Sequence, residues 1–164
     1  MGDLEDPNRP LEIRDQITND YLFSYGGISR FFREVKDNQV LMATRCLGCG
    51  IVRCPPRTRC SECHGTAEWI ELAGTGVVLA VTDCYFVPSN YAVHRYLKMP
   101  YTLALIKLDG TDTALYNTVV TGRQDLHSVR PGDRVRATFR DRREGRLTDF
   151  YFLLERGQED NSSV

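Results

Sequence analysis

The sequence lacks several features that would by themselves place a protein in a class. No apolar run approaches the roughly 20 residues of a membrane-spanning helix, and no internal repeat is visible. The first ten residues, MGDLEDPNRP, are acidic and polar, unlike a secretory signal, so we expect a cytoplasmic, reducing setting in which disulfides are disfavoured. The formal net charge of −1 gives no general attraction to nucleic acid or to a membrane surface.

Histidine is scarce, with three in 164 residues, and no catalytic pattern surrounds them. His94 and His127 fall in separate predicted loops, and no serine or carboxylate motif lies near either in the sequence. We interpret both as solvated loop residues, with His94 also a candidate ligand contact because pocket-facing loops carry function. No grouping of cysteine and histidine suited to nucleophilic catalysis is visible outside the cysteine-rich stretch described below. We therefore expect no activity from this chain alone.

Cysteine, in contrast, is concentrated in RCLGCGIVRCPPRTRCSECHG, residues 45–65. Cys46 and Cys49 form one C-x-x-C motif, and Cys60 and Cys63 form a second after ten intervening residues. Each motif turns two sulfurs toward one centre, and two motifs complete a closed tetrahedral site about 2.3 Å from Zn²⁺. A lone C-x-x-C can be a redox pair, but two in tandem seldom are. The spacing predicts a structural zinc site with these four ligands.

Three further residues need an interpretation. Cys54 lies between the two motifs, where strand alternation aims it away from the metal, and we interpret it as a small apolar filler; a spare ligand or reactive thiol is the alternative. Cys84 lies in a strand pattern and is expected in the core. His64 follows Cys63 and could replace it as a ligand, although four cysteines already complete the shell.

The chain is expected to contain an extended N-terminal arm (1–28), a helix (29–38), a zinc ribbon (39–72), a barrel (73–155) and a disordered tail (156–164). In the helix, SRFFREVKDN, Ser29 is the predicted N-cap and the apolar residues recur at three-to-four spacing. In the ribbon, QVLMATRC pairs with IVRC as a hairpin, and TAEWIEL leads out of the second C-x-x-C motif.

Five strand patterns follow the ribbon, and a helix-length insertion, GRQDLHSVRPG, separates the third from the fourth. This number and placement match a five-stranded OB-fold barrel, with a small sandwich as the alternative. The fold class is therefore mainly β. The five patterns are GTGVVLAVTDCYFVP, PYTLALIKLDG, TALYNTVV, DRVRATFRD and LTDFYFLLE.

Taken together, these motifs resemble the domain of unknown function 35 family, in which a rubredoxin-like zinc ribbon precedes an OB-fold. The resemblance covers residues 29–155, and its most specific part is C-x-x-C, PPR, C-x-x-C and then a strand with G-x-G. Cys54 departs from the pattern, since a bulky apolar residue is expected before the prolines, and LDGTDTALYN is shorter and more polar than the usual hairpin.

The resemblance implies an accessory subunit in acyl-CoA chemistry. Its partner would be a thiolase-fold enzyme (thiolase, acyltransferase or retro-aldolase), or secondly a hot-dog-fold enoyl-CoA hydratase, in a hetero-oligomer. The implied cofactor is structural Zn²⁺, with acyl-CoA as a possible ligand. The chain would supply one wall of the CoA-ester site, with the loop 89–99 as the contact surface.

A CoA site requires cations for its phosphates and an apolar slot for the acyl group. The sequence offers such residues in PPRTRC and in the loop NYAVHRYLKM. The candidate CoA contacts are Arg57, Arg59, Tyr91, His94, Arg95, Tyr96 and Lys98.

Aromatic residues gather before and within the helix, and aromatics dominate interface hot spots. The predicted partner anchors are Tyr21, Phe23, Tyr25, Phe31 and Phe32. The alternative for Phe31 and Phe32 is packing on the ribbon of this chain.

Two other functions stay open at this stage. RVRATFRDRREGR is rich in arginine, and both ribbons and OB barrels occur in nucleic-acid binders, although acidic residues interrupt the stretch and the chain is slightly acidic. An independent small acyltransferase using Cys54 or Cys84 is the third possibility.

Overall fold

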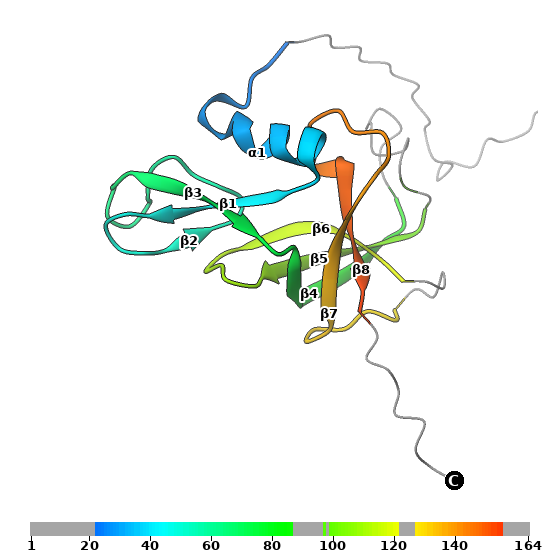
Figure 1. Cartoon of the computed structure of the whole chain (residues 1–164). Coiled ribbons are helices and arrows are strands. Elements are labelled where there is room, and N and C mark those ends of the chain that lie inside the picture. The colour runs from blue at the N-terminus through cyan, green and yellow to red at the C-terminus, as the bar shows by residue number, and fades with distance from the viewer. Residues whose placement is uncertain (1–21, 87–96, 98, 122–126, 156–164) are drawn as a thin grey trace, which may run out of the picture.

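The computed structural model describes residues 22–86, 97, 99–121 and 127–155. Three short helical segments and a three-stranded sheet come first, followed by a five-stranded barrel (Figure 1). Within these residues, no helix has the length and apolar character needed to cross a bilayer. The helical segments are η1 (Gly26–Ile28), α1 (Ser29–Arg33), η2 (Glu34–Asn38) and η4 (Leu147–Asp149). The strands are β1 (Leu41–Cys46), β2 (Val52–Arg53), β3 (Ala67–Leu72), β4 (Thr75–Cys84), β5 (Tyr101–Leu108), β6 (Ala114–Val120), β7 (Arg134–Phe139) and β8 (Phe150–Leu154).

The helix differs from its prediction in two details. Only its first five residues are α-helical, and Glu34–Asn38 continues as a π-helix until Gln39 ends it at φ 59°. Ser29 is not the N-cap, because it has helical dihedrals and its hydroxyl donates to the carbonyl of Gly26 at 2.7 Å. The preceding 3₁₀ turn therefore supplies the start that we assigned to Ser29.

The ribbon sheet has the order β2-β1-β3, with both pairs antiparallel. The central strand β1 is buried at four successive residues, Leu41–Thr44, and helix α1 lies along one face of the sheet (Figure 1). The predicted hairpin of the ribbon and the strand leading out of it are both present.

The second sheet closes into a barrel with the order β4-β5-β6-β8-β7. All neighbouring strands are antiparallel except β6 and β8, which are parallel. Closure excludes the small sandwich and confirms the five-stranded OB-fold. Residues 122–126 of the predicted helical insertion lie outside the described residues, and the part that follows from His127 is turn and irregular chain.

One hydrophobic core runs through the helix, the ribbon and the barrel. Phe31 is 1% exposed, and its ring packs edge-on against Phe32 and Phe150 at centroid distances of 5.2 and 6.4 Å. Hydrogen bonds also join the turn between β5 and β6 to β2 of the ribbon. The N–H of Asp112 donates to the carbonyl of Val52, and the N–H of Val52 donates to Asp112 Oδ2, both at 2.8 Å. The ribbon is therefore fixed to one end of the barrel.

Candidate metal centre and neighbouring groups

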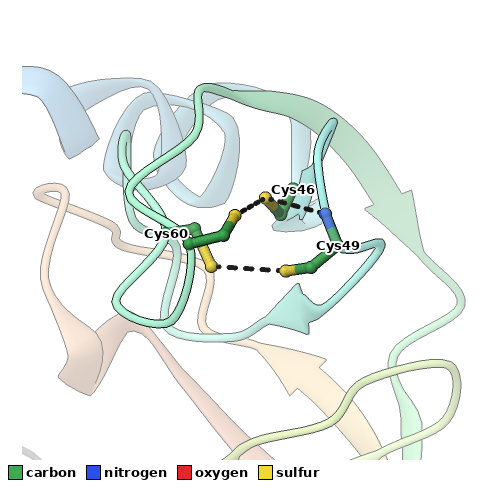
Figure 2. A group of neighbouring side chains, drawn as sticks. Cys46, Cys49 and Cys60 are labelled. Atoms are coloured by element: carbon green, nitrogen blue, oxygen red, sulfur yellow. Dashed lines mark hydrogen bonds between the residues drawn. The ribbon is translucent and has the colours of Figure 1, made fainter.

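The four predicted ligands converge between two turns of the ribbon. Their sulfur atoms all lie within 4.8 Å of one another, and Cys46 Sγ is 3.3 Å from Cys63 Sγ. Figure 2 shows the contact between Cys49 Sγ and Cys60 Sγ, which are 3.5 Å apart. A tetrahedron with Zn–S bonds of about 2.3 Å has edges of about 3.8 Å, so the spacing fits zinc with little adjustment. Four sulfurs fill the tetrahedral shell, as in a structural site.

Both turns need a left-handed residue just after their second cysteine. Gly50 follows Cys49 at φ 76°, and His64 follows Cys63 at φ 58°. This conformation suits glycine and is tolerated by histidine. His64 therefore shapes the turn, and the metal cluster does not include it.

Glycine also leaves room for the sulfurs. A Cβ on Gly48 would come within 3.2 Å of Cys63 Sγ, and one on Gly65 would lie 3.3 Å from the same atom and 3.5 Å from Cys46 Sγ. The two contacts with Cys63 Sγ are closer than most real Cβ contacts, whereas the one with Cys46 Sγ is ordinary. The cage consequently depends on small residues between its ligands.

Backbone N–H groups prepare two of the thiols for a cation. The N–H groups of Cys49 and Gly48 donate to Cys46 Sγ at 3.5 and 3.4 Å and lower the pKa of that thiol. The pKa of Cys60 falls to about 6 because the N–H groups of Cys63 and Glu62 point at its sulfur. Such N–H···S contacts stabilise the thiolate, which is the form that binds metal.

Four thiols this close cannot all ionise without a positive charge between them. At Cys49, the N–H of Ile51 lowers the pKa, but burial and the neighbouring thiols of Cys60, Cys46 and Cys63 together raise it to about 12. A divalent cation removes that repulsion between thiolates. The donor set, the spacing and this charge requirement all fit Zn²⁺.

The two other cysteines are not part of the cage. Cys54 is 1% exposed, and its burial raises the pKa of the thiol to about 12, so it is a packed, unreactive thiol, as the filler interpretation predicts. Its backbone is held by Thr113, whose Oγ1 accepts from Cys54 N–H at 2.9 Å and donates to Cys54 O at 3.0 Å. Cys84, expected in the core, is instead half-buried at the last position of β4.

Two of the predicted CoA contacts can be placed. Arg57 and Arg59 are exposed on the ribbon between β2 and β3, and the Arg59 guanidinium reaches the carbonyl of His64 at 3.4 Å. The other five, Tyr91, His94, Arg95, Tyr96 and Lys98, lie outside the described residues. The strands on either side of these five residues pair at Cys84 and Tyr101. The ribbon, which carries Arg57 and Arg59, contacts the other end of β5.

The predicted partner anchors divide into buried and exposed residues. Phe31 and Phe32 are buried in the core of this chain, which agrees with the alternative of internal packing. Tyr25 is half-buried and stacks on Phe32 with ring centroids 3.5 Å apart, while Phe23 is 57% exposed beside it. Tyr21 lies outside the described residues. Phe23 and, in part, Tyr25 are therefore accessible at the surface.

The arginine-rich stretch is largely engaged within the chain. Arg134 makes a two-pronged contact with Asp109 at 2.9 and 2.5 Å, and Arg136 pairs with Glu155 at 2.7 Å. Arg143 donates to the carbonyl of Lys36 at 2.8 Å, which ties the loop between β7 and β8 to the end of the helix.

One group was missed by the sequence reasoning. No carboxylate motif lies near His127 in the sequence, but in the fold its Nδ1 lies 2.6 Å from Asp83 Oδ2. Its Nε2 lies 3.3 Å from the hydroxyl of Tyr85. The residues are 42 and 44 positions apart and no local motif joins them. The pairing of β4 with β5 and of β5 with β6 places Asp83, Thr102 and Val119 at the same end of the barrel, and His127 follows β6 in the chain.

Comparison with known protein families gives matches over most of the described chain. Residues 33–68 match the family described as "ChsH2, rubredoxin-like zinc ribbon domain", and residues 69–140 match "ChsH2, C-terminal OB-fold domain". The boundary between the two matches falls inside β3.

Two curated proteins are similar in sequence. A "DUF35 domain-containing scaffold protein" of Methanocaldococcus jannaschii is 30% identical over 91 residues, which are 54% of this chain and 62% of that protein. A "Probable enoyl-CoA hydratase alpha subunit" of Thermomonospora curvata is 33% identical over 84 residues, 49% of this chain and 24% of that protein. The matched segment thus spans less than two thirds of either relative.

Two solved structures share the fold. The "Ltp2-ChsH2(DUF35) aldolase" matches with a TM-score of 0.57 and 23% identity, covering 86% of this chain and 97% of the other. A DUF35 protein of unknown function from Sulfolobus solfataricus matches with a TM-score of 0.56 and 20% identity, covering 79% of this chain and 87% of the other. Both likenesses support the ribbon-plus-barrel architecture.

Proposed function

This chain belongs to the DUF35 family, and from that premise we propose that it is a zinc-binding accessory subunit of an acyl-CoA-processing complex. Its partner in this proposal is a thiolase-fold enzyme, with a hot-dog-fold hydratase as the second choice. The observation that carries the proposal is the matched ribbon-plus-barrel pair. The similar proteins bear the descriptions "DUF35 domain-containing scaffold protein", "Probable enoyl-CoA hydratase alpha subunit" and "Ltp2-ChsH2(DUF35) aldolase".

The metal centre supports a structural role. Zinc in a four-sulfur cage has no open position at which a water or a carbonyl could bind, unlike the zinc of hydrolases. In the proposed complex the ion would be held by Cys46, Cys49, Cys60 and Cys63, and would shape the ribbon without taking part in chemistry. Cys54 is buried with a raised pKa, which argues against an acyltransferase that uses this thiol.

Partner binding is assigned to the aromatic residues at the start of the described chain. Leu22 is fully exposed and Phe23 is 57% exposed, while Tyr25 holds the segment against the helix by stacking on Phe32. Exposed apolar side chains beside a fixed aromatic offer apolar area that a second protein can bury, and aromatic residues are enriched among interface hot spots. Tyr21 belongs to the same proposal.

The acyl-CoA contact is the finer part of the proposal. Arg57 and Arg59 are exposed cations on the ribbon, suited to phosphate groups, and residues 89–99 supply the remaining candidate contacts. A wall that closes over a thioester would exclude water and fix the ester relative to the partner's nucleophile. Loss of a phosphate contact should then raise KM and leave kcat nearly unchanged.

The pairing of the arginines favours this function over nucleic-acid binding. A single-strand groove needs cations that are available to phosphates, with exposed aromatics between them. Here Arg134, Arg136 and Arg146 are paired with carboxylates at 2.5, 2.7 and 3.2 Å. Each contact would have to be given up before the arginine could bind a phosphate.

The proposal is tested by purifying the tagged full chain from the cells that encode it. We expect a thiolase-fold or hydratase-fold enzyme at equal stoichiometry, and we expect Phe23→Ala to weaken its retention. Tyr116→Ala is the matched control, because Tyr116 is also an exposed aromatic, 65% accessible on β6. Acyl-CoA turnover is then compared for the partner alone and for the complex. Purification of the chain without either enzyme, or a folded partner that is fully active alone, would contradict the proposal.

A further inference from the structure

A hydrogen-bonded chain of side chains lies at the end of the barrel away from the ribbon. Thr102 Oγ1 donates to Asp83 Oδ1 at 2.6 Å, Asp83 Oδ2 accepts from His127 Nδ1 at 2.6 Å, and His127 Nε2 faces the hydroxyl of Tyr85 at 3.3 Å. The zinc ribbon contacts the turn after β5. Asp83 lies one residue before the end of β4, and this end pairs with the first residues of β5, at the other end of the barrel. This group is therefore separate from the metal centre.

The inner part of this chain of contacts is rigid. Asp83 on β4 and Thr102 on β5 are directly paired in the antiparallel register, and the side chain of Asp83 is 8% exposed. Cross-strand partners point to the same face, so the threonine hydroxyl fixes the carboxylate without bending either strand. A carboxylate held in this way orients the imidazole that donates to it.

The outer part is open to solvent. The side chain of His127 is 72% exposed and Tyr85 is 61% exposed, so a ligand can reach the phenol. His127 also has φ 64°, a left-handed conformation that is uncommon for a residue other than glycine. Phe86, 79% exposed, adds apolar surface next to Tyr85 in the chain.

The contacts indicate which atoms of His127 and Tyr85 carry the protons. With Nδ1–H donated to Asp83, the neutral imidazole keeps an unshared pair on Nε2, which can accept the O–H of Tyr85. Carboxylate, imidazole and hydroxyl stand in the same order in serine hydrolases, where the carboxylate fixes the tautomer of the histidine. Here a phenol occupies the position of the serine hydroxyl.

We propose that Asp83, His127 and Tyr85 form a proton relay that activates the Tyr85 oxygen toward a carbonyl ligand of the acyl-ester class. Tyr85 is the group that meets the ligand, His127 takes or returns its proton, and Asp83 and Thr102 are positioning residues. This activity goes beyond the accessory role and requires no partner.

The relay is tested on the isolated full chain with p-nitrophenyl acetate. In the expected step, the Tyr85 oxygen forms a bond to the acetyl carbon while its O–H proton passes to His127 Nε2. The ester C–O bond breaks, and p-nitrophenolate leaves with the electron pair. The product is an acetyl ester of Tyr85, which peptide mapping by mass spectrometry locates.

Tyr116 provides an internal control, because its exposure of 65% matches the 61% of Tyr85 and no hydrogen-bond partner is found for it among the described residues. General-base assistance is worth about 10²-fold at its lower end, so Tyr85 should be acetylated on the order of 10²-fold faster than Tyr116. Equal acetylation of the two tyrosines in the folded chain would overturn the proposal.

Variants separate the roles of the relay residues. His127→Gln should reduce the Tyr85-to-Tyr116 ratio to about one, the value expected without a base. Asp83→Asn should reduce it partly, because the amide no longer fixes the Nδ1–H tautomer. His127→Gly suits the positive φ, and added imidazole should restore the ratio in this variant, which a purely structural role would not produce. An unchanged ratio in His127→Gln, or no rescue by imidazole in a folded His127→Gly chain, would contradict the relay.

Discussion

The ribbon and the barrel reach a fixed structure by different means. The ribbon has three strands, one of them of two residues, and its turns are held by four cysteine sulfurs within 4.8 Å of one another. The barrel has five strands that close on themselves around buried residues such as Ile106, Phe150 and Phe152. A region too small to bury a core of its own requires a metal, whereas a closed sheet supplies its own interior.

The helix qualifies this contrast, because it contributes to both regions. Phe31 and Phe32 follow each other in α1, contact each other edge-on and belong to the same buried cluster as ribbon and barrel residues. Arg143 of the barrel ties the end of the helix through the carbonyl of Lys36. The two regions therefore differ in how they are stabilised but share a core.

The largest expected difference between the ribbon and the barrel comes from removing one zinc ligand. Cys60→Ser should unfold the ribbon and abolish stoichiometric zinc, since structural zinc contributes an apparent 10–16 kcal/mol, roughly, in small zinc domains. Metal analysis and hydrogen exchange of β1 and β3 measure this. Cys54→Ala is the matched control, because Cys54 is buried outside the cage, and it should keep full zinc. Retained zinc in Cys60→Ser would refute the ligand assignment.

A mutation in the barrel should lower the unfolding free energy of the chain and leave zinc binding unchanged. A Cβ on Gly76 would lie 2.6 Å from Lys107 O and 3.0 Å from Leu108 Cα, so Gly76→Ala forces β4 away from β5 and should cost about 3 kcal/mol of unfolding free energy. Chemical denaturation measures the loss, and zinc content should stay unchanged below the transition.

Gly110→Ala is the control for that variant. Gly110 has φ 79° with open space around its Cβ position, so alanine there should cost about 1 kcal/mol, from the left-handed conformation alone. Equal losses in the two variants would show that close strand packing at Gly76 is not what restricts that position.

The smallest expected effect concerns a surface pair of the barrel and its dependence on pH. The Arg134 guanidinium, followed by the Thr75 hydroxyl, lowers the pKa of Asp109 from 3.8 to about 2. A depressed carboxyl pKa stabilises the folded state above about pH 4, and this contribution is lost as pH falls from 4 toward 2. Because Asp109 is 46% exposed, Asp109→Asn should cost less than about 1 kcal/mol at pH 7.

Acid unfolding followed by circular dichroism measures this effect. The difference between wild type and Asp109→Asn should shrink as the pH approaches 2. Asp141→Asn, at an exposed position in the loop after β7, should follow the wild-type curve at every pH. A constant difference between wild type and Asp109→Asn down to pH 2 would rule out the ionic origin of the stabilisation.

The accuracy of the sequence predictions follows the same division between local and long-range structure. The cage was predictable because a C-x-x-C turn places both of its sulfurs through local geometry. The strand patterns of the barrel were predictable because alternation and bounding glycines are local as well. Ser29 was misassigned as the N-cap because a preceding 3₁₀ turn, Gly26–Ile28, displaced the helix start, and short turns of this kind leave little trace in a sequence.

The sequence by itself determined the four zinc ligands, the order of helix, ribbon and barrel, and the filler role of Cys54. Each of these depends on spacings of a few residues, which fix local geometry whatever the rest of the chain does. Tertiary structure alone decided that Phe31 and Phe32 are buried and that the arginines are paired. It alone also placed Asp83 beside His127, because the pairing of β4, β5 and β6 brings residues 44 positions apart to one end of the barrel, and no local pattern records which strand ends will meet.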